Sequence, residues 1–130
     1  DTPFPKRLCE IYEDYCQILD NWKPDALSIE RLYFTNNQKT GIDVAQARGI
    51  IIMAAAQRGI EINEYTPLQV KQAVVGYGQA VKKQVQEMTK NILKLSCVPK
   101  PDDTADALAM TICHAQTSGS LLRNIKASNI

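Results

Sequence analysis

The sequence is poor in the residues that build several common kinds of catalytic and metal site. It holds one histidine, His114, and its four cysteines form no CxxC pair. A structural zinc site needs clustered cysteine and histidine ligands, and a nucleophilic triad needs a positioned histidine. His114 lies eleven residues beyond Asp103 on the same expected helix, too far along the axis to share a metal with it. We therefore interpret His114 as a packed or surface residue.

Several longer patterns are also missing. No run of about 18 apolar residues occurs, the first residues lack the layout of a signal peptide, and no Walker motif is present. Membrane spanning and nucleotide hydrolysis therefore have no support. Cys9 and Cys16 lie seven residues apart on one expected helix face and are predicted to be buried thiols. Thiols of this kind suit a reducing compartment, so we expect a cytoplasmic protein.

What is present is a helix, a strand, a helix, a strand and then more helices. Apolar spacing, proline and glycine predict helices that end near Trp22, Arg58, Val75, Leu95 and Gln116, and strands over 26–30 and 60–65. The tail from Ser118 is predicted to be polar and frayed. Two parallel strands alone are a poor structure, because parallel sheets are usually larger and covered on both faces. We therefore expect further strands, from another chain or, as we favour, preceding residue 1.

Glu30 closes the first predicted strand. Functional groups gather at the carboxyl ends of strands in open α/β sheets, so Glu30 is a candidate site residue. The alternative is that Glu30 begins an ordinary surface loop.

Asp103 and Asp106 lie three residues apart, and on a helix they face the same side. Carboxylate oxygens in this arrangement could hold a hard cation. The alternative is that Asp102 or Asp103 caps the last helix and that the acids favour the positive end of its dipole. Capping explains Asp106 poorly, because Asp106 belongs to the second turn.

A basic segment precedes these aspartates. Residues 71–100 hold six lysines against one acid, Glu87, and three of the lysines, Lys71, Lys82 and Lys83, flank the loop Gly76-Tyr77-Gly78. Positive charge beside a glycine loop suits a phosphate backbone. A solvated helix face would explain the same pattern.

Taken together, these motifs resemble the RuvC family of Holliday junction resolvases, in order and in spacing, over most of residues 4–117. The matching segments are Ile29-Glu30, the aromatic pair Tyr33-Phe34, Gln46-Ala47-Arg48-Gly49, Gln69-Val70-Lys71-Gln72, Val74-Val75-Gly76-Tyr77-Gly78 and Asp103-Thr104-Ala105-Asp106-Ala107-Leu108-Ala109. The resemblance implies an α/β, ribonuclease H-like domain over 1–117, with a parallel strand pair, helices on both sides and a tail over 118–130. It also implies a homodimer that nicks four-way DNA junctions symmetrically and works with the branch-migration proteins RuvA and RuvB.

The resemblance further implies roles for individual residues. Glu30, Asp103 and Asp106 match three of four acids that hold two Mg²⁺ ions, for which Mn²⁺ is a plausible substitute. Lys71 and Lys82 match lysines near the scissile phosphate, and the basic stretch adds Lys83 as a DNA contact. The aromatic pair falls where the family contacts bases near the crossover, with core filling as the alternative.

The chain departs from the family in one respect. The family's first acid lies on an opening strand in a Gly-Ile-Asp-Pro-Gly-like phrase, which this sequence lacks. We therefore expect a ribonuclease H-like fold without its first strands and an incomplete set of catalytic acids. Two alternatives remain: a junction-binding protein that does not cut, and another ribonuclease H-like nuclease or transposase.

Overall fold

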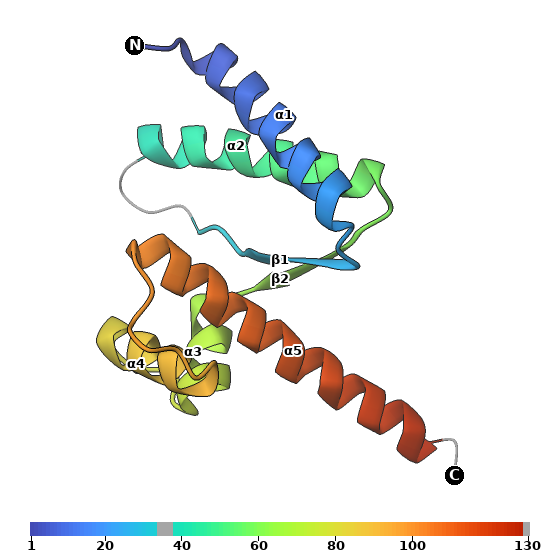
Figure 1. The fold of residues 1–130 in the computed structure, drawn as a ribbon, viewed down its shortest axis with the longest axis vertical. Coiled ribbons are helices and arrows are strands. Elements are labelled where there is room, and N and C mark those ends of the chain that lie inside the picture. The colour runs from blue at the N-terminus through green and yellow to red at the C-terminus, as the bar shows by residue number, and fades with distance from the viewer. Residues whose placement is uncertain (34–37, 129–130) are drawn as a thin grey trace. The chain divides into compact units, whose positions relative to one another are not determined.

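The computed structural model describes residues 1–33 and 38–128, and the side chains of 1–33 and 40–119. Its elements, in chain order, are α1 (Phe4–Trp22), β1 (Ala26–Glu30), α2 (Gln38–Gln57), β2 (Glu61–Tyr65), α3 (Pro67–Val75), α4 (Lys82–Ile92) and α5 (Asp102–Ser128) (Figure 1). The predicted order of helices and strands is confirmed. The chain divides into two compact units, which are Asp1–Leu27 with Leu32–Asn63 and Ser28–Arg31 with Glu64–Ile130.

The strands β1 and β2 form a two-stranded sheet. At one end the Glu61 N–H donates to the Asp25 carbonyl at 3.3 Å, and at the other the Arg31 N–H donates to the Tyr65 carbonyl at 2.9 Å. Early residues pair with early residues and late with late, so the strands are parallel, as predicted. Both strands start in the first unit and end in the second.

The first unit is built around the contact between α1 and α2. Pro5 occupies the first turn of α1, where a missing N–H costs nothing, and Lys23 ends the helix with a φ of 47°. The buried core consists of Leu19, Ala54 and Ala55. The two small residues of this core, Ala54 and Ala55, lie in the last turn of α2.

The two cysteines of α1 differ from prediction. Cys9 is exposed and Cys16 half-buried, so the prediction of buried thiols was wrong. At 100° per residue the two thiols lie about 80° and 60° around α1 from the buried Leu19, at the margin of the packed face.

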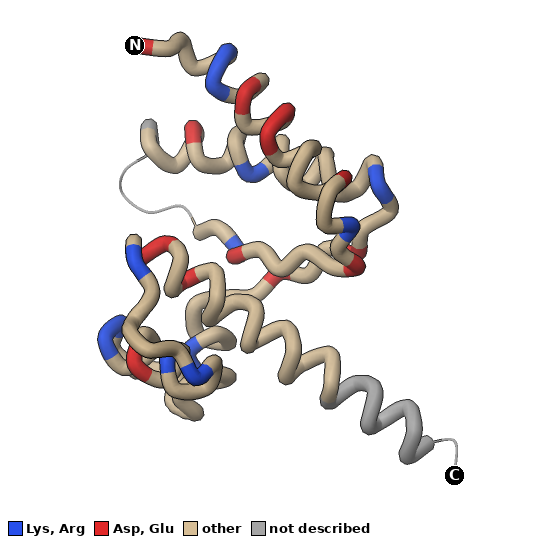
Figure 2. Tube along the Cα trace, viewed as in Figure 1, with Lys and Arg blue, Asp and Glu red and all other residues tan. Residues whose placement is uncertain are grey.

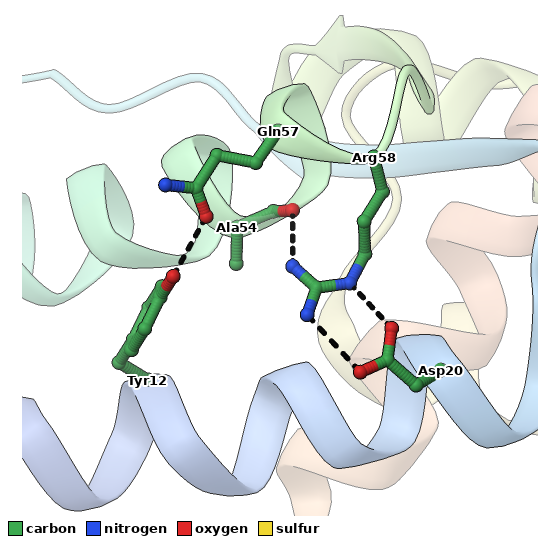
Figure 3. A network of polar contacts seen from close by, with 5 residues as sticks. All are labelled: Tyr12, Asp20, Ala54, Gln57 and Arg58. Atoms are coloured by element: carbon green, nitrogen blue, oxygen red, sulfur yellow. Dashed lines mark hydrogen bonds and ion pairs between the residues drawn. The ribbon is translucent and has the colours of Figure 1, made fainter.

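Arg58, just after α2, links that helix to α1. It donates from Nε and Nη2 to the Asp20 carboxylate at 2.7 and 3.2 Å (Figure 3).

The second unit packs α3, α4 and α5 together. Its buried core is formed by Tyr65, Val70, Val74, Ala109, Ile112 and Cys113. The start of α3 follows the prediction: the Thr66 hydroxyl accepts from the Gln69 N–H, and the Gln69 side chain accepts from the Thr66 N–H. Gly76 ends α3 with a φ of 79°, a backbone conformation that favours glycine.

Two helix ends in the second unit differ from prediction. The helix α4 ends at Ile92, earlier than the predicted Leu95, and Lys94 beyond it has a φ of 55°. The helix α5 continues to Ser128, so the prediction that it ends near Gln116 was wrong. No proline follows Pro101 and leucine, isoleucine, lysine and alanine recur after 120, so nothing in the backbone stops the helix. No helix among the described residues is long and apolar enough to cross a membrane.

Candidate active site

A pocket of about 580 Å³ lies within the second unit. Four of the residues predicted to act on DNA line it, namely Glu30, Lys71, Lys82 and Asp106. The other lining residues are mainly apolar: Pro67, Val70, Ala80, Val81, Val85, Ala109 and Met110, with Gln79. A small group of charged side chains against an apolar wall is a common form of binding site.

Each charged lining residue comes from a different element. Glu30 is the last residue of β1, at the carboxyl end of the strand, as predicted. Lys71 is half-buried on α3, and Lys82 is the first residue of α4. Asp106 lies in the second turn of α5, next to the fully buried Ala105, which anchors that turn in the protein. Residues 76 positions apart in sequence, Glu30 and Asp106, therefore line one cavity.

The other predicted residues of this unit, Asp103 and Lys83, do not line this pocket. Asp103 is exposed in the first turn of α5, and Lys83 is exposed on α4. Tyr33 belongs to the first unit and is 62% exposed, so the alternative that it fills a core was wrong. Phe34 lies outside the described residues.

Charged side chains at the start of α4 and at the start of α5 contact each other. The Lys82 Nζ lies 3.1 Å from Asp102 Oδ2 and 3.9 Å from Asp106 Oδ2. Basic positions along α4 and acidic positions at the start of α5 are visible in Figure 2. The hydrogen bond with Asp102 raises the pKa of Lys82, with a further contribution from the charge of Asp106. The same bond lowers the pKa of Asp102. Both groups are consequently charged at neutral pH.

Two residues of this contact were not predicted as site residues. Asp102 was named only in the alternative that Asp102 or Asp103 caps the helix, and its carboxylate bonds to α4: Oδ2 to Lys82, and Oδ1 accepts from the Gln86 Nε2 at 3.2 Å. The sequence holds a signal for this contact, because Lys82 and Gln86 lie four residues apart, as do Asp102 and Asp106. Each pair occupies one helix face. That signal is visible only when both helices are known to be adjacent.

The donor chemistry of the pocket fits a hard divalent cation. Glu30 and Asp106 supply carboxylate oxygens, which Mg²⁺ prefers, and Mg²⁺ is often held by one or two carboxylates together with substrate phosphates. The described residues contain no group of three or more His, Cys, Asp or Glu side chains placed to hold a metal. The fit therefore rests on two carboxylates of this unit, with the remaining ligands left to substrate and water.

His114 is accounted for outside the pocket. Its Nδ1 lies 2.7 Å from the hydroxyl of the buried Tyr65, and the imidazole is half-buried. The interpretation of His114 as a packed residue is confirmed.

Comparison with solved structures shows which proteins share this fold. The chain superposes on Thermus thermophilus RuvC with a TM-score of 0.80, at 34% identity over 88% of this chain and 69% of that one. Against T. thermophilus RuvC in complex with a Holliday junction substrate, the TM-score is 0.83. The chain is thus an α/β protein of the ribonuclease H-like class.

Sequence comparison narrows the class to a family. The family model for crossover junction endodeoxyribonuclease RuvC matches residues 1–114. The corresponding protein of Ruminiclostridium cellulolyticum is 53% identical over 93% of this chain and 74% of its own length. That of Brevibacillus brevis is 55% identical over 88% of this chain and 69% of its own length. The chain belongs to the RuvC family of crossover junction endodeoxyribonucleases.

Proposed function

We propose that this chain resolves four-way DNA junctions by paired nicks, with the pocket of the second unit as the centre of the reaction. The observation that carries the proposal is that Glu30, Lys71, Lys82 and Asp106 line one cavity although they come from four elements. Hydrolysis of a phosphodiester is helped by carboxylates that bind a metal ion and by lysines that stabilise negative charge on the phosphate. Family membership supports the four-way junction as the substrate.

The acids and the lysines have separate roles in this proposal. Glu30 and Asp106 would hold Mg²⁺, and Mn²⁺ is suited to the same oxygen ligands. Asp103, one turn before Asp106 and outside the pocket lining, is proposed as a further ligand because of the family resemblance. A bound divalent metal supplies Lewis-acid stabilisation of the phosphoryl oxygens and activation of water. Lys71 and Lys82, which line the same pocket, would stabilise negative charge on the phosphate, with the Lys82 ammonium group beside Asp106. Lys83 and the aromatic residues Tyr33 and Phe34 are proposed to contact DNA beyond the cleaved bond.

The proposal extends to partners. Paired symmetric nicks require two active sites, which a homodimer provides, and membership of the family supports cooperation with RuvA and RuvB during branch migration in the cytoplasm. The pocket itself belongs to one chain, so the metal and phosphate contacts can be tested without the partners.

Cleavage of a synthetic four-way junction tests the function. The junction carries a different label on each strand and is incubated with the chain in Mg²⁺, and the products are separated on a denaturing gel. We expect nicks in two opposing strands. The variant Asp106→Asn should cut at least about 100-fold more slowly, as expected when a group that places the reacting centre is lost.

A matched control tests whether the loss of any acid slows cleavage or only the loss of the acid in the pocket. Glu87→Gln removes one acid from the exposed surface of α4 without altering the pocket lining, and should cut like the unaltered chain. Equal rates for Asp106→Asn and the unaltered chain would overturn the assignment of the site. A junction that is bound but uncut in Mg²⁺ and in Mn²⁺ would favour the junction-binding alternative over the nuclease.

A further inference from the structure

Asp102 is the acid of the α5 terminus to which the family resemblance assigns no role. It is the first residue of α5, and helix-terminal acids commonly interact with free backbone N–H groups. Here its carboxylate bonds instead to two side chains of α4, Lys82 and Gln86. The contact is specific in geometry, because the two oxygens have different partners.

The four side chains form two matched pairs. Lys82 and Gln86 project from one face of α4, and Asp102 and Asp106 project from one face of α5, each pair at a spacing of four residues. Lys82 lies nearer to Asp102 than to Asp106, with Nζ–Oδ2 distances of 3.1 and 3.9 Å. Gln86 bonds only to Asp102 among the described contacts of this cluster. Asp102 is therefore the main partner of Lys82.

Lys82 has a long side chain that needs such a partner. Its side chain is 56% exposed, and a free lysine in that setting samples many rotamers, which makes it a poor fixed charge. A metal bound to Asp106 would compete with the ammonium group for the same carboxylate. A second acid that is not a pocket-lining residue can hold the ammonium group without competing for the metal.

We propose that Asp102 is a positioning residue that holds the Lys82 ammonium group beside Asp106 at the edge of the pocket, ready to contact a DNA phosphate. Gln86 orients the Asp102 carboxylate by donating to its second oxygen. The inference rests on the proposed function, because it gives Lys82 its phosphate-binding role. It adds a residue that acts through Lys82 and touches neither the metal nor the DNA.

The first test needs neither metal nor DNA. The chain is treated with a limiting amount of acetic anhydride, and the acetylation of Lys82 relative to its exposed neighbour Lys83 is measured by mass spectrometry. An ion-paired amine is held and screened, so Asp102→Asn should raise the Lys82 to Lys83 ratio by roughly threefold, the size expected for a partly exposed ion pair. Asp102→Glu, which keeps a carboxylate, should restore a ratio close to that of the unaltered chain. Asp14→Asn, an exposed change on α1, controls for lost negative charge and should leave the ratio unchanged.

The second test is a double-mutant cycle on junction cleavage. Lys82→Ala should reduce kcat by roughly 100-fold, as the loss of one fixed electrostatic group does, and Asp102→Asn by about tenfold. The double variant should cut no more slowly than Lys82→Ala, because Asp102 acts through the lysine. Junction affinity measured in EDTA should weaken for Lys82→Ala but not for Asp102→Asn, which removes a negative charge near the DNA. A merely structural role would lower affinity and rate together.

The outcomes separate this inference from the proposed function. An unchanged acetylation ratio in Asp102→Asn would overturn the inference whatever the chain does to DNA. Effects on kcat that multiply in the double variant would also overturn it, because Asp102 would then act independently of Lys82. If the unaltered chain does not cut junctions while the ratio rises as expected, the proposed function fails and the Asp102–Lys82 contact stands as a positioning contact.

Discussion

Asp20 in the first unit and Asp102 in the second each bind a basic side chain from another part of the same unit, and the two contacts have different consequences. Arg58 bonds to both Asp20 oxygens and also donates from Nη1 to the Ala54 carbonyl at 3.0 Å (Figure 3). The planar guanidinium is thereby fixed in one orientation. Lys82 instead lies between two carboxylates, at one edge of a pocket.

The surroundings of the two bases explain this difference. Arg58 follows the last residue of α2, and its contacts join α2 to α1 beside a second inter-helix bond, from the Tyr12 hydroxyl to Gln57 Oε1 at 2.7 Å. Those bonds satisfy the polar groups that a closed helix pair leaves at its margin. Lys82 has donors that a phosphate can still engage. The Arg58 guanidinium is bonded on both sides and therefore stabilises the fold. The Lys82 ammonium group lies at a pocket edge, where it can also contact a bound phosphate.

The largest predicted effect is a loss of stability when the packed core of the first unit is overfilled. Ala55 is fully buried between α1 and α2, whereas the next residue, Ala56, is exposed. Ala55→Leu should lower the free energy of unfolding by about 1–3 kcal/mol, because extra volume in a packed core forces the helices apart. Ala56→Leu adds the same atoms in solvent and should change it by less than about 0.5 kcal/mol. Urea unfolding followed by circular dichroism measures both, and equal losses would contradict the packing of this helix pair.

A smaller effect is predicted for the buried hydrogen bond of the second unit. Tyr65→Phe keeps the ring and removes the hydroxyl that bonds to His114 at 2.7 Å. The expected loss is about 0.5–1.5 kcal/mol of unfolding free energy, the usual net value of one hydrogen bond. Tyr77→Phe makes the same change on a side chain that is 57% exposed and should be close to neutral. If Tyr77→Phe cost as much as Tyr65→Phe, the bond to His114 would not be the cause.

Most of the fold could be predicted from local signals. The cap Thr66-Pro67 and the glycines Gly59 and Gly76 mark where backbone geometry must change. The helix α2 ends two residues before Gly59, and α3 begins at Pro67 and ends next to Gly76. The exceptions are the ends of α4 and α5, of which α5 continues through Gly119 to Ser128 without a positive φ at that glycine. The frayed tail was inferred from polarity, and polarity does not prevent helix formation when the backbone is unobstructed.

The candidate site could be predicted only in part. A strand end and the second turn of a helix made Glu30 and Asp106 candidates, and the family resemblance gave them their roles. Asp102 was missed because its partner lies across the irregular connection 93–101, and nothing local indicates that α4 and α5 bring their first turns together. The exposed position of Cys9 was missed for a related reason, since a helix face can be recognised without knowing how much of it a neighbour covers.

The smallest predicted effect concerns the pH dependence of the Asp20–Arg58 contact. The hydrogen bond from Arg58 lowers the pKa of Asp20. A carboxyl whose folded-state pKa is lowered adds stability above its unfolded value, about 3.9, and loses that contribution as the pH falls through the folded-state value. Asp20→Asn should therefore lower the Tm by roughly 1–3 °C at pH 7, as expected for an exposed ion pair, and the difference from the unaltered chain should vanish in strong acid. Asp14→Asn, an exposed change on the same helix, is the control for lost charge. A Tm difference that persists undiminished as the pH falls through the folded-state pKa would mean that Asp20 acts through packing. In that case the contact would not depend on the charge of Asp20, and the contrast with the lysine of the second unit would rest on geometry alone.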